Sequence, residues 1–279
     1  MTMLLHISDP HFGTEQPPVV EALLRLAAQE HPELVMLSGD ITQRARRSQF
    51  RAARGFVDRL GDIPTLVIPG NHDIPLFNLA ARLLAPYANF ERAFGAELEP
   101  VHESARLLLI ALNTTRPRRH KNGELSREQI ERVARRLRAA QHGQLRAVVV
   151  HQPIAVTRPE DEHNLLRGHA AAIEAWSAAG ADLVLGGHIH LPYVLALHER
   201  LPGLARRLWA VQAGTAVSRR VREGAPNSVN LIRWGDALPS GRCVIERWDY
   251  SAAAGGFGPA GTSTLDTGWR ANDQPPPIS

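Results

Sequence analysis

The sequence contains very little cysteine and no long apolar run. Cys243 is the only cysteine among 279 residues, which excludes a framework of intramolecular disulfides. No apolar stretch approaches the roughly 20 residues that a membrane-spanning helix requires. Residues 1–5 lack the basic segment and long apolar core of a signal peptide, so we expect them to begin the first strand. These absences lead us to expect a cytoplasmic protein without a membrane segment.

Lysine is almost as scarce as cysteine. Lys121 is the only lysine, and the remaining 31 of the 32 basic residues are arginines. The isoelectric point near 9.9 would by itself suggest an anionic partner such as nucleic acid. However, the net charge of +4 is modest for this length, and the excess of arginine over lysine resembles a compositional bias. Local basic clusters are therefore more informative than the total charge.

The hydrophobic content of 44% and the charged content of 22% are ordinary for a globular domain with a real core. Apolar runs at 3–8, 34–37 and 65–68 read as buried strands, and they alternate with helical spacing at 19–29 and 48–60. This β-α-β-α-β pattern predicts parallel strands joined by right-handed crossovers.

The pattern continues through the middle of the chain. We expect a helical region at 76–94 that breaks at Pro86, and a helix from Ser126 to about 143 with a capping-like start. Further strands are expected near 101–102 and at 106–112, 145–150 and 183–185, with a helix at 169–179.

The period changes to about two after residue 190. Four more strands are expected at 193–197, 207–212, 228–234 and 244–248, and we predict that they form a second sheet packed on the first. We place the domain at residues 1–250 and a Gly/Ala/Pro-rich tail at 251–279, which has little to bury.

Polar side chains appear wherever an apolar strand of the first 190 residues stops. They offer oxygen and nitrogen donors without a thiolate, a set suited to Mn, Fe or Zn. Without His72, the strand-end residues number seven, which exceeds the three or four ligands that one catalytic zinc uses, so two metals sharing the carboxylate of Asp40 fit the count better. The strand-end residues are Asp9, His11, Asp40, Asn71, His72, His151, His188 and His190.

A structural explanation has to be weighed for each of these residues. A single histidine is more often a hydrogen-bonded turn or core residue than a ligand, and Asp9 or Asp40 alone could cap a helix. That explanation would need eight coincidences at successive strand ends, so we reject it for the set. We retain it for His6, His31, His102, His142 and His198.

Five short blocks resemble the signature motifs of the calcineurin-like metallophosphoesterases. They are Asp9-Pro10-His11, Gly39-Asp40, Gly70-Asn71-His72-Asp73, His151 and Gly187-His188-Ile189-His190. The resemblance implies a four-layer αββα sandwich of two packed mixed β-sheets flanked by helices, with a di-metal site at the sheet edges. It further implies that one metal is held by Asp9, His11, Asp40 and His190, and the other by Asp40, Asn71, His151 and His188. His72 would not be a ligand.

Two divalent transition-metal ions can clamp a phosphoryl group and acidify a bridging water for in-line attack on phosphorus. We expect hydrolysis of phosphodiester bonds by this route. His72, next to the ligand Asn71, is expected to be catalytic because the leaving alkoxide needs a proton. We count Asn71 with it as a catalytic residue.

The compact chain looks similar to the bacterial cyclic-nucleotide phosphodiesterases of this superfamily, although Gln152 stands where those members often have a second histidine. We expect a small nucleotide-type phosphodiester, such as a 3′,5′-cyclic nucleotide, as substrate. Basic or polar segments at 44–47, 116–121 and 157–169 follow strands that end at the site, and solvated surface charges explain them equally well. The candidate substrate contacts are Arg44, Arg116, Arg118, Arg119 and His163.

Other functions remain open at this point. A nuclease would use the same metals and basic loops on a phosphate backbone, but the loops lack aromatic side chains for stacking bases. The superfamily's DNA-repair nucleases also carry a capping domain, for which we expect no room here. A phosphomonoesterase is a further alternative, and a non-enzymatic scaffold is disfavoured because all eight positions are intact. The identity of the metals and the oligomeric state stay open.

Overall fold

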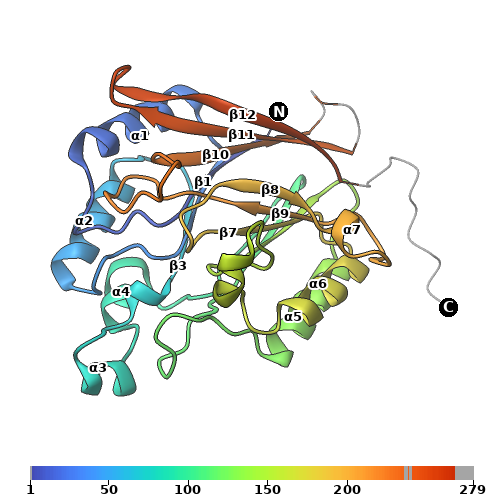
Figure 1. The fold of residues 1–279 in the computed structure, drawn as a ribbon, viewed down its shortest axis with the longest axis horizontal. Helices are drawn as coiled ribbons and strands as arrows, with labels where there is room; N and C mark the ends of the chain where they lie inside the picture. The colour runs from blue at the N-terminus through green and yellow to red at the C-terminus, as the bar shows by residue number, and fades with distance from the viewer. Residues whose placement is uncertain (1, 236–237, 239–240, 268–279) are drawn as a thin grey trace.

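The computed structural model describes residues 2–235, 238 and 241–267. Two six-stranded mixed sheets pack against each other, and helices cover their outer faces (Figure 1). This arrangement confirms the expected four-layer αββα sandwich. Within the described residues, no helix is both long enough and apolar enough to cross a bilayer.

The first sheet has the order β12-β11-β10-β1-β2-β3. Strands β1, β2 and β3 run parallel, whereas β10, β11 and β12 are added by antiparallel pairing. The helices α1 and α2 belong to the two crossovers between the parallel strands. The bounds are β1 Thr2–Ile7, α1 Pro17–Glu30, β2 Leu34–Ser38, α2 Arg47–Asp58, β3 Thr65–Ile68, β10 Ser228–Trp234, β11 Arg242–Ser251 and β12 Gly256–Asp266.

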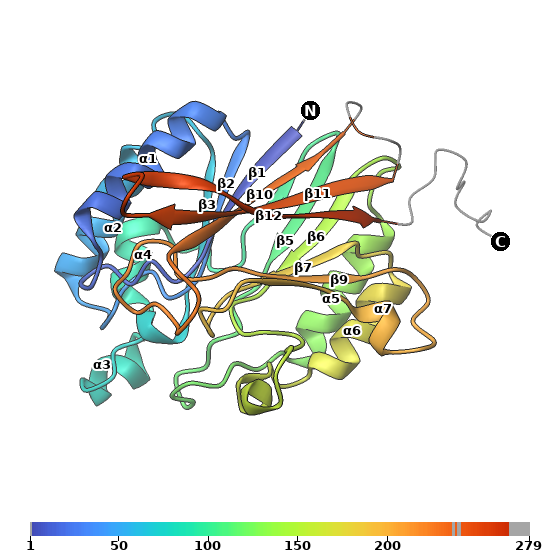
Figure 2. The ribbon, with the colours of Figure 1, turned by 45° about the horizontal axis from the view of Figure 1, so that its top comes forward.

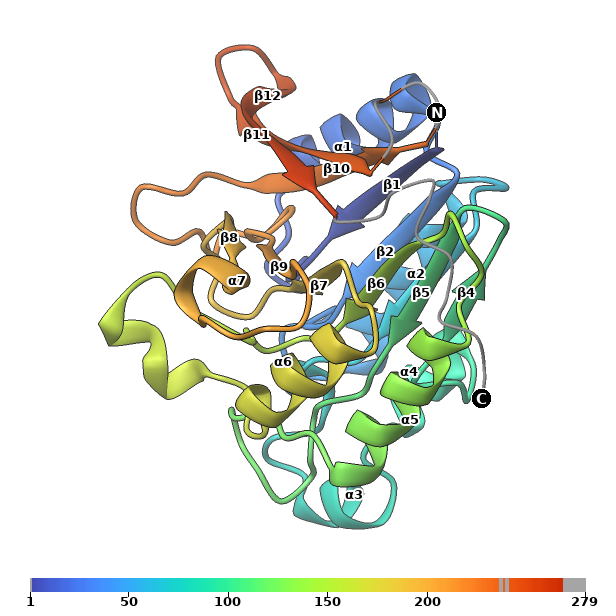
Figure 3. The same cartoon turned by 90° about the vertical axis from the view of Figure 1, so that its right-hand side faces the viewer.

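The second sheet has the order β4-β5-β6-β7-β9-β8. Its four central strands are parallel, and its two edge strands are antiparallel to their neighbours. Figure 3 shows α1 on one side of the stacked sheets and α5 and α6 on the other. The bounds are β4 Val101–Glu103, β5 Leu107–Ala111, α5 Arg127–Arg138, β6 Leu145–Val149, α6 His169–Ala178, β7 Leu183–Gly186, β8 Tyr193–Ala196, α7 Leu197–Arg200 and β9 Trp209–Gln212.

Buried residues on both faces of the strands divide the core into three layers. In β1, Leu5 and Ile7 pack with the helices outside the sheet, while Leu4 belongs to the cluster between the two sheets. In β5, Leu108 faces the cluster of α5 and α6 and Leu109 faces inward. Because successive side chains in a strand point to opposite faces, strands covered on both faces become the continuous apolar runs seen in the sequence.

The expected division of the strands between the sheets is wrong. The four strands after residue 190 do not form a sheet of their own, because β8 and β9 join the second sheet and β10 and β11 extend the first. Strand β10 pairs antiparallel with β1, so the chain returns to its own N-terminal strand. The first sheet therefore combines the N-terminal strands with the last strands of the described chain, whereas the second sheet is built from the middle of the chain, between Val101 and Gln212.

The expected start of a tail at residue 251 is also wrong. Strand β11 continues to Ser251, and Gly256–Asp266 forms β12, which pairs with β11 along its whole length apart from one register shift. The backbone pairing of this edge hairpin needs few large side chains, which explains why the composition of the segment concealed it. Residues 268–279 lie outside the described residues.

The region between β3 and β4 contains two short helices, α3 (Leu79–Leu84) and α4 (Ala88–Phe94), as the break at Pro86 predicts. Figure 2 shows α3 at the periphery of the molecule. Arg82 fastens it to the basic loop, since its guanidinium donates to the carbonyls of Pro117 at 2.6 Å and Arg119 at 2.7 Å. The loop and α3 are therefore held together at one side of the fold.

Gly70 occupies a tight place between β3 and the short 3-10 helix Asn71–Asp73. A Cβ atom at this position would collide with the backbone nitrogen and the carboxylate of Asp40. Gly55, in the exposed face of α2, would place a Cβ in open space. The two glycines thus differ in what a methyl group would meet.

Gly70→Ala should lower the free energy of unfolding by about 1–3 kcal/mol, because overpacking displaces backbone or side chains. Gly55→Ala should raise it by about 0.5–1 kcal/mol, because alanine is the better residue inside a helix. Urea denaturation curves of both variants and the parent chain measure these changes. Equal effects of the two substitutions would contradict the packing described for Gly70.

Candidate metal centre

The carboxyl ends of strands from both sheets meet at one place. Asp9 follows β1, Asp40 follows β2, and Asn71 and His72 lie in the 3-10 helix after β3. His151 follows β6 of the second sheet, and His188 and His190 follow β7. The structure thus brings together side chains that are up to 181 positions apart, as 190 − 9 shows. Parallel sheets present their sites at this end of the strands.

The backbone at this junction is unusual. Asp9, His11, Asp40, His188 and His190 all have positive φ angles, between 46° and 72°. Non-glycine residues rarely adopt this left-handed region, and each case costs on the order of 1–3 kcal/mol unless the surroundings fix it. Five of the seven predicted ligands therefore occupy a conformation that local preference alone would not select.

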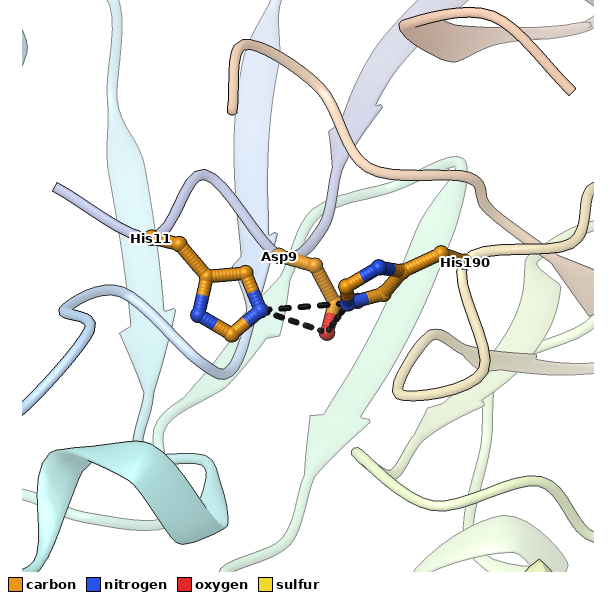
Figure 4. Close-up of side chains that lie close together, drawn as sticks. All are labelled: Asp9, His11 and His190. Atoms are coloured by element: carbon orange, nitrogen blue, oxygen red, sulfur yellow. Dashed lines mark hydrogen bonds and ion pairs between the residues drawn. The ribbon is translucent and has the colours of Figure 1, made fainter. Parts of the chain in front are cut away.

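The first donor cluster contains Asp9, His11 and His190 (Figure 4). His11 Nε2 lies 3.1 Å from His190 Nε2 and 3.7 Å from Asp9 Oδ1, and His190 Nε2 lies 3.3 Å from Asp9 Oδ1. Donors about 2.1 Å from one tetrahedral metal are separated by about 3.4 Å. The three spacings fit one metal ion.

The second donor cluster contains Asp40, His151 and His188, whose ligand atoms lie within 4.8 Å of one another. Asp40 Oδ1 is 3.3 Å from His151 Nε2, while Asp40 Oδ2 is 3.8 Å from His11 Nε2 of the first cluster. One carboxylate therefore has an oxygen facing each cluster, which is the arrangement expected of a shared ligand.

Several polar atoms in these clusters are buried and lack a hydrogen-bond partner among the described residues. They are Asp9 Oδ1, Asn71 Oδ1, His151 Nε2 and both ring nitrogens of His188. Leaving such atoms unsatisfied costs free energy, so native proteins rarely do it without a ligand or ion. A convergent set of orphaned acceptors is what a cation requires, and the residues present fit two metals.

Hydrogen bonds to backbone carbonyls orient two of the histidines. His151 Nδ1 lies 2.9 Å from the carbonyl of Ser38, and His190 Nδ1 lies 2.5 Å from the carbonyl of Arg220. Each ring uses its Nδ1–H as the donor there, so Nε2 is the nitrogen that points to the cluster and that would offer its lone pair to a metal. Such outer contacts fix the tautomer and the direction of metal-binding histidines.

The protonation states also suit cation binding. Burial lowers the pKa of His11 and of His188 to about 3, so both rings stay neutral near pH 7. Burial alone would lower the pKa of His151 as well, but Asp40 and then Asp9 raise it to about 9. The pKa of Asp40 is held well below its usual value, because His151, His72 and His11 overcome the opposing effect of burial. A metal would replace the proton on His151.

Asp73 is a structural residue that the sequence analysis left without a role. Its Oδ2 accepts from the backbone N–H of Ile41 and of Gly70, both at 2.9 Å, and its Oδ1 accepts from the N–H and hydroxyl of Thr42, both at 2.8 Å. It thereby joins the loop after β2 to the loop after β3. Burial, followed by the charge of Asp40, raises its pKa to about 7. The sequence signal that could have identified Asp73 is its position as the fourth residue of the Gly-Asn-His-Asp block.

His72 lies at the wall of the site rather than in its floor. Its Nδ1 donates to the carbonyl of Gln43 at 2.9 Å, and its Nε2 lies 3.1 Å from Nη1 of Arg220, which donates to it. His72 can geometrically share a metal with His11 and Asp40, but the adjacent guanidinium disfavours another cation at its Nε2. Arg220 was not predicted, because nothing in the run 218–222 distinguishes it from surface arginines.

A cleft of about 240 Å³ opens over the donor clusters, lined by Asp40, Asn71, His72 and His188. Among the predicted substrate contacts, Arg44 lines this cleft, and so do two neighbours of the others, His120 and Lys121. His163 is not in the lining, but its Nε2 lies 3.3 Å from Lys121 Nζ.

The three remaining predicted contacts, Arg116, Arg118 and Arg119, lie elsewhere. Arg116 donates to Gln129 Oε1 at 2.7 Å, and both Arg118 and Arg119 pair with Glu124. Their guanidinium groups stabilise the loop itself, which explains why they do not reach the cleft. The loop contributes its end, His120 and Lys121, instead.

His6 is a core histidine rather than a candidate ligand, as the sequence analysis expected. It lies inside β1, and its Nε2 bonds Ser38 Oγ at 2.8 Å. Burial lowers its pKa to about 4, so it is a neutral core residue. Gln152, beside His151, is also buried, and its Oε1 accepts from the Thr114 hydroxyl at 2.6 Å.

The sequence profile for calcineurin-like phosphoesterases matches residues 2–192. A probable cyclic nucleotide phosphodiesterase from Synechococcus is 27% identical over 187 residues, which cover 65% of this chain and 67% of that protein. The DNA double-strand break repair protein Mre11 of Saccharolobus solfataricus is 30% identical over 147 residues, but these cover only 42% of this chain and 39% of Mre11.

Two solved structures have a similar fold. A purple acid phosphatase from yellow lupin superposes with a TM-score of 0.73 at 11% identity, over 100% of this chain and 57% of that one. A dimetal phosphatase from Danio rerio gives a TM-score of 0.66 at 13% identity, over 95% of this chain and 99% of that one. At such identities the similarity concerns the fold alone. The profile match extends over well more than half of the sequence, and the chain therefore belongs to the calcineurin-like phosphoesterase family.

Proposed function

We propose that this protein is a di-metal phosphodiesterase that acts on small nucleotide-type diesters, with 3′,5′-cyclic nucleotides as the favoured class. One observation carries the proposal: two donor clusters share the carboxylate of Asp40 beneath a cleft with basic walls. Mn, Fe or Zn suits these nitrogen and oxygen donors. The similarity to a probable cyclic nucleotide phosphodiesterase supports the choice of substrate.

In this proposal Asp40 contributes to both metal sites. Asp9, His11 and His190 complete one site, and Asn71, His151 and His188 complete the other. The orphaned oxygens of Asp9 and Asn71 and the orphaned nitrogens of His188 support the assignment. Asn71 would supply a neutral carbonyl oxygen, which binds an ion without adding charge.

When bound, the metals would polarise the phosphoryl oxygens and acidify a water molecule. The side chains of the cleft have to bind the anionic diester and orient it. Arg44, Lys121 and Arg220 line the cleft and offer positive charge to it. Positioning and electrostatics of this kind supply most of the catalysis in phosphoryl transfer.

His72 is proposed as the group that assists the leaving alkoxide. Its Nδ1–H is fixed on the carbonyl of Gln43, so its Nε2 is the atom available on the cleft side. There it meets Arg220 Nη1. In this geometry Arg220 is the N–H donor, and His72 would add a second donor when its Nε2 carries a proton. Either donor would act on the oxygen that gains charge as its bond to phosphorus breaks, which is the moment when such a donor accelerates the reaction.

A nuclease is the second candidate. Mre11 is 30% identical over part of this chain, and a basic cleft also suits a phosphate backbone. A phosphomonoesterase would use the same metals. The substrate experiments below separate these functions.

The first prediction from this proposal concerns the metals. Protein reconstituted with Mn should contain two ions per chain, and Asp40→Ala should contain at most one, because both sites lose a shared ligand. Elemental analysis after removal of free metal measures the stoichiometry. Asp62→Ala, which removes an exposed carboxylate, should retain both ions. A single ion in the parent protein, or unchanged content in Asp40→Ala, would overturn the shared-carboxylate assignment.

The second prediction concerns the reaction. The metal-loaded protein should cleave bis(4-nitrophenyl) phosphate faster than 4-nitrophenyl phosphate, and it should turn over 3′,5′-cyclic nucleotides. Initial rates with Mn, Fe and Zn on this panel, together with single-stranded DNA, provide the measurement. A preference for monoesters with every metal would contradict the diesterase proposal. Cutting of DNA without turnover of cyclic nucleotides would favour the nuclease.

The third prediction separates His72 from the metal ligands. His72→Ala should keep both metals and lose roughly 10²–10⁴-fold in kcat, the range for a lost proton donor. The loss should be smaller for a nitrophenol leaving group, which scarcely needs a proton. His102→Ala, in the edge strand β4, is the control and should leave kcat unchanged. Equal losses for good and poor leaving groups would show that His72 positions the phosphate instead, and loss of a metal would show that it is a ligand.

A further inference from the structure

A second hollow, of about 430 Å³, adjoins the cleft over the metal centre. Lys121, His188, His190 and Arg220 line both spaces, so they form one continuous depression. The outer wall of the second hollow comes from residues that have no part in the proposed metal chemistry. These are Asp161, Asn164, Ile189, Val221 and Arg222.

Asp161 and Asn164 come from the 3-10 helix Pro159–Asn164, which follows His151. Residues three apart in such a helix lie on the same side. Asp161 is 4% exposed and Asn164 is 5% exposed, whereas the intervening Glu162 and His163 face solvent. The short helix is held in place, since Asn122 Nδ2 donates to the carbonyl of His163 at 3.0 Å. It therefore presents one buried polar side to the hollow.

That polar side is incompletely satisfied. Asp161 Oδ1 accepts from Arg222 Nη1 at 3.0 Å, but Asp161 Oδ2 has no hydrogen-bond partner among the described residues. Asn164 Oδ1 is likewise buried without a partner there. Two acceptors on one wall, each more than nine-tenths buried, lack donors. Unpaired buried acceptors are costly, which points to donors supplied by a ligand.

The charges around these acceptors restrict what the ligand can be. Arg222 already pairs with Asp161, and Lys121 and Arg220 lie on the same hollow. A ligand ammonium group would meet three cations, so a cationic donor is disfavoured. A neutral hydroxyl can donate to Asp161 or Asn164 without electrostatic penalty, and its own oxygen can accept from a neighbouring basic group.

We propose that this hollow is a subsite for a free sugar hydroxyl of the phosphodiester substrate, bound by Asn164 and Asp161. The proposal rests on the proposed function, because it places the phosphate over the adjoining metal centre and the alcohol portion here. It makes the substrate class a ribonucleotide rather than a deoxyribonucleotide. A deoxyribonucleotide lacks this hydroxyl and would leave the buried acceptor without a donor, so the site should discriminate against it.

The test compares 3′,5′-cyclic AMP with its 2′-deoxy analogue on the metal-loaded protein. The parent protein should prefer the ribonucleotide by about 10- to 100-fold in kcat/KM, as expected for one buried hydrogen bond. Asn164→Leu should reduce this preference towards one by losing rate mainly on the ribonucleotide. Asn164→Asp keeps an acceptor oxygen of the same size and should retain most of the preference. Glu162→Gln, on the exposed side of the same short helix, is the control and should match the parent.

A binding measurement guards against misfolded variants. The inhibition constants of AMP and 2′-deoxy-AMP, measured against bis(4-nitrophenyl) phosphate, should show the same preference and the same loss in Asn164→Leu. Equal kcat/KM for the two cyclic nucleotides in the parent, or a preference that Asn164→Leu leaves unchanged, would overturn the subsite. Failure to cleave any diester, bis(4-nitrophenyl) phosphate included, would instead contradict the proposed function. The two failures are therefore distinguishable.

Discussion

The buried charge of Asp40 is the constraint on which the rest of the site depends. An ionised carboxylate that is 2% exposed must be compensated by hydrogen bonds and cations. Its Oδ1 accepts from the backbone N–H of His72 at 2.8 Å and faces His151, while Oδ2 faces His11. Asp40, at the end of β2, thus contacts residues at the ends of β1, β3 and β6, which belong to two sheets. The hydrogen bonds of Asp73 join the loop that carries Asp40 to the loop after β3, so both loops are held in place by the protein's own side chains.

The sheets supply the other half of that arrangement. Strands β1 and β2 end beside β6 and β7 because the inner faces of the two sheets share one apolar cluster, with Leu4 and Met36 from the first and Val149 and Leu185 from the second. The large apolar side chains fill the layers on and between the sheets, whereas the donors follow the strand ends. This separation lets five residues keep left-handed backbone angles at the strand ends, since the core provides the stability that the strained loops consume.

The sequence was most informative at the ends of the successive apolar strands. Apolar runs buried on both faces mark β1, β2, β3, β6 and β7, and the residue types after them predicted the donor clusters. The assignment of later strands to sheets could not be predicted, because β8 to β11 have the same alternation whichever sheet they join. Arg220 and Asn164 were also beyond reach: an arginine in a basic loop and an asparagine in a short helix acquire meaning only from the atoms that face them.

Gln152 anchors the loop that contributes Lys121 to the cleft. Its Oε1 accepts from Thr114, next to the end of β5, and its Nε2 lies 3.3 Å from the carbonyl of Lys121. Gly123 permits this approach, because a Cβ there would collide with the carboxamide of Gln152. The backbone of the only lysine is therefore anchored to the sheet rather than left to a flexible loop. Much of the conformational entropy of that loop is lost during folding, so less of it opposes the capture of an anionic ligand.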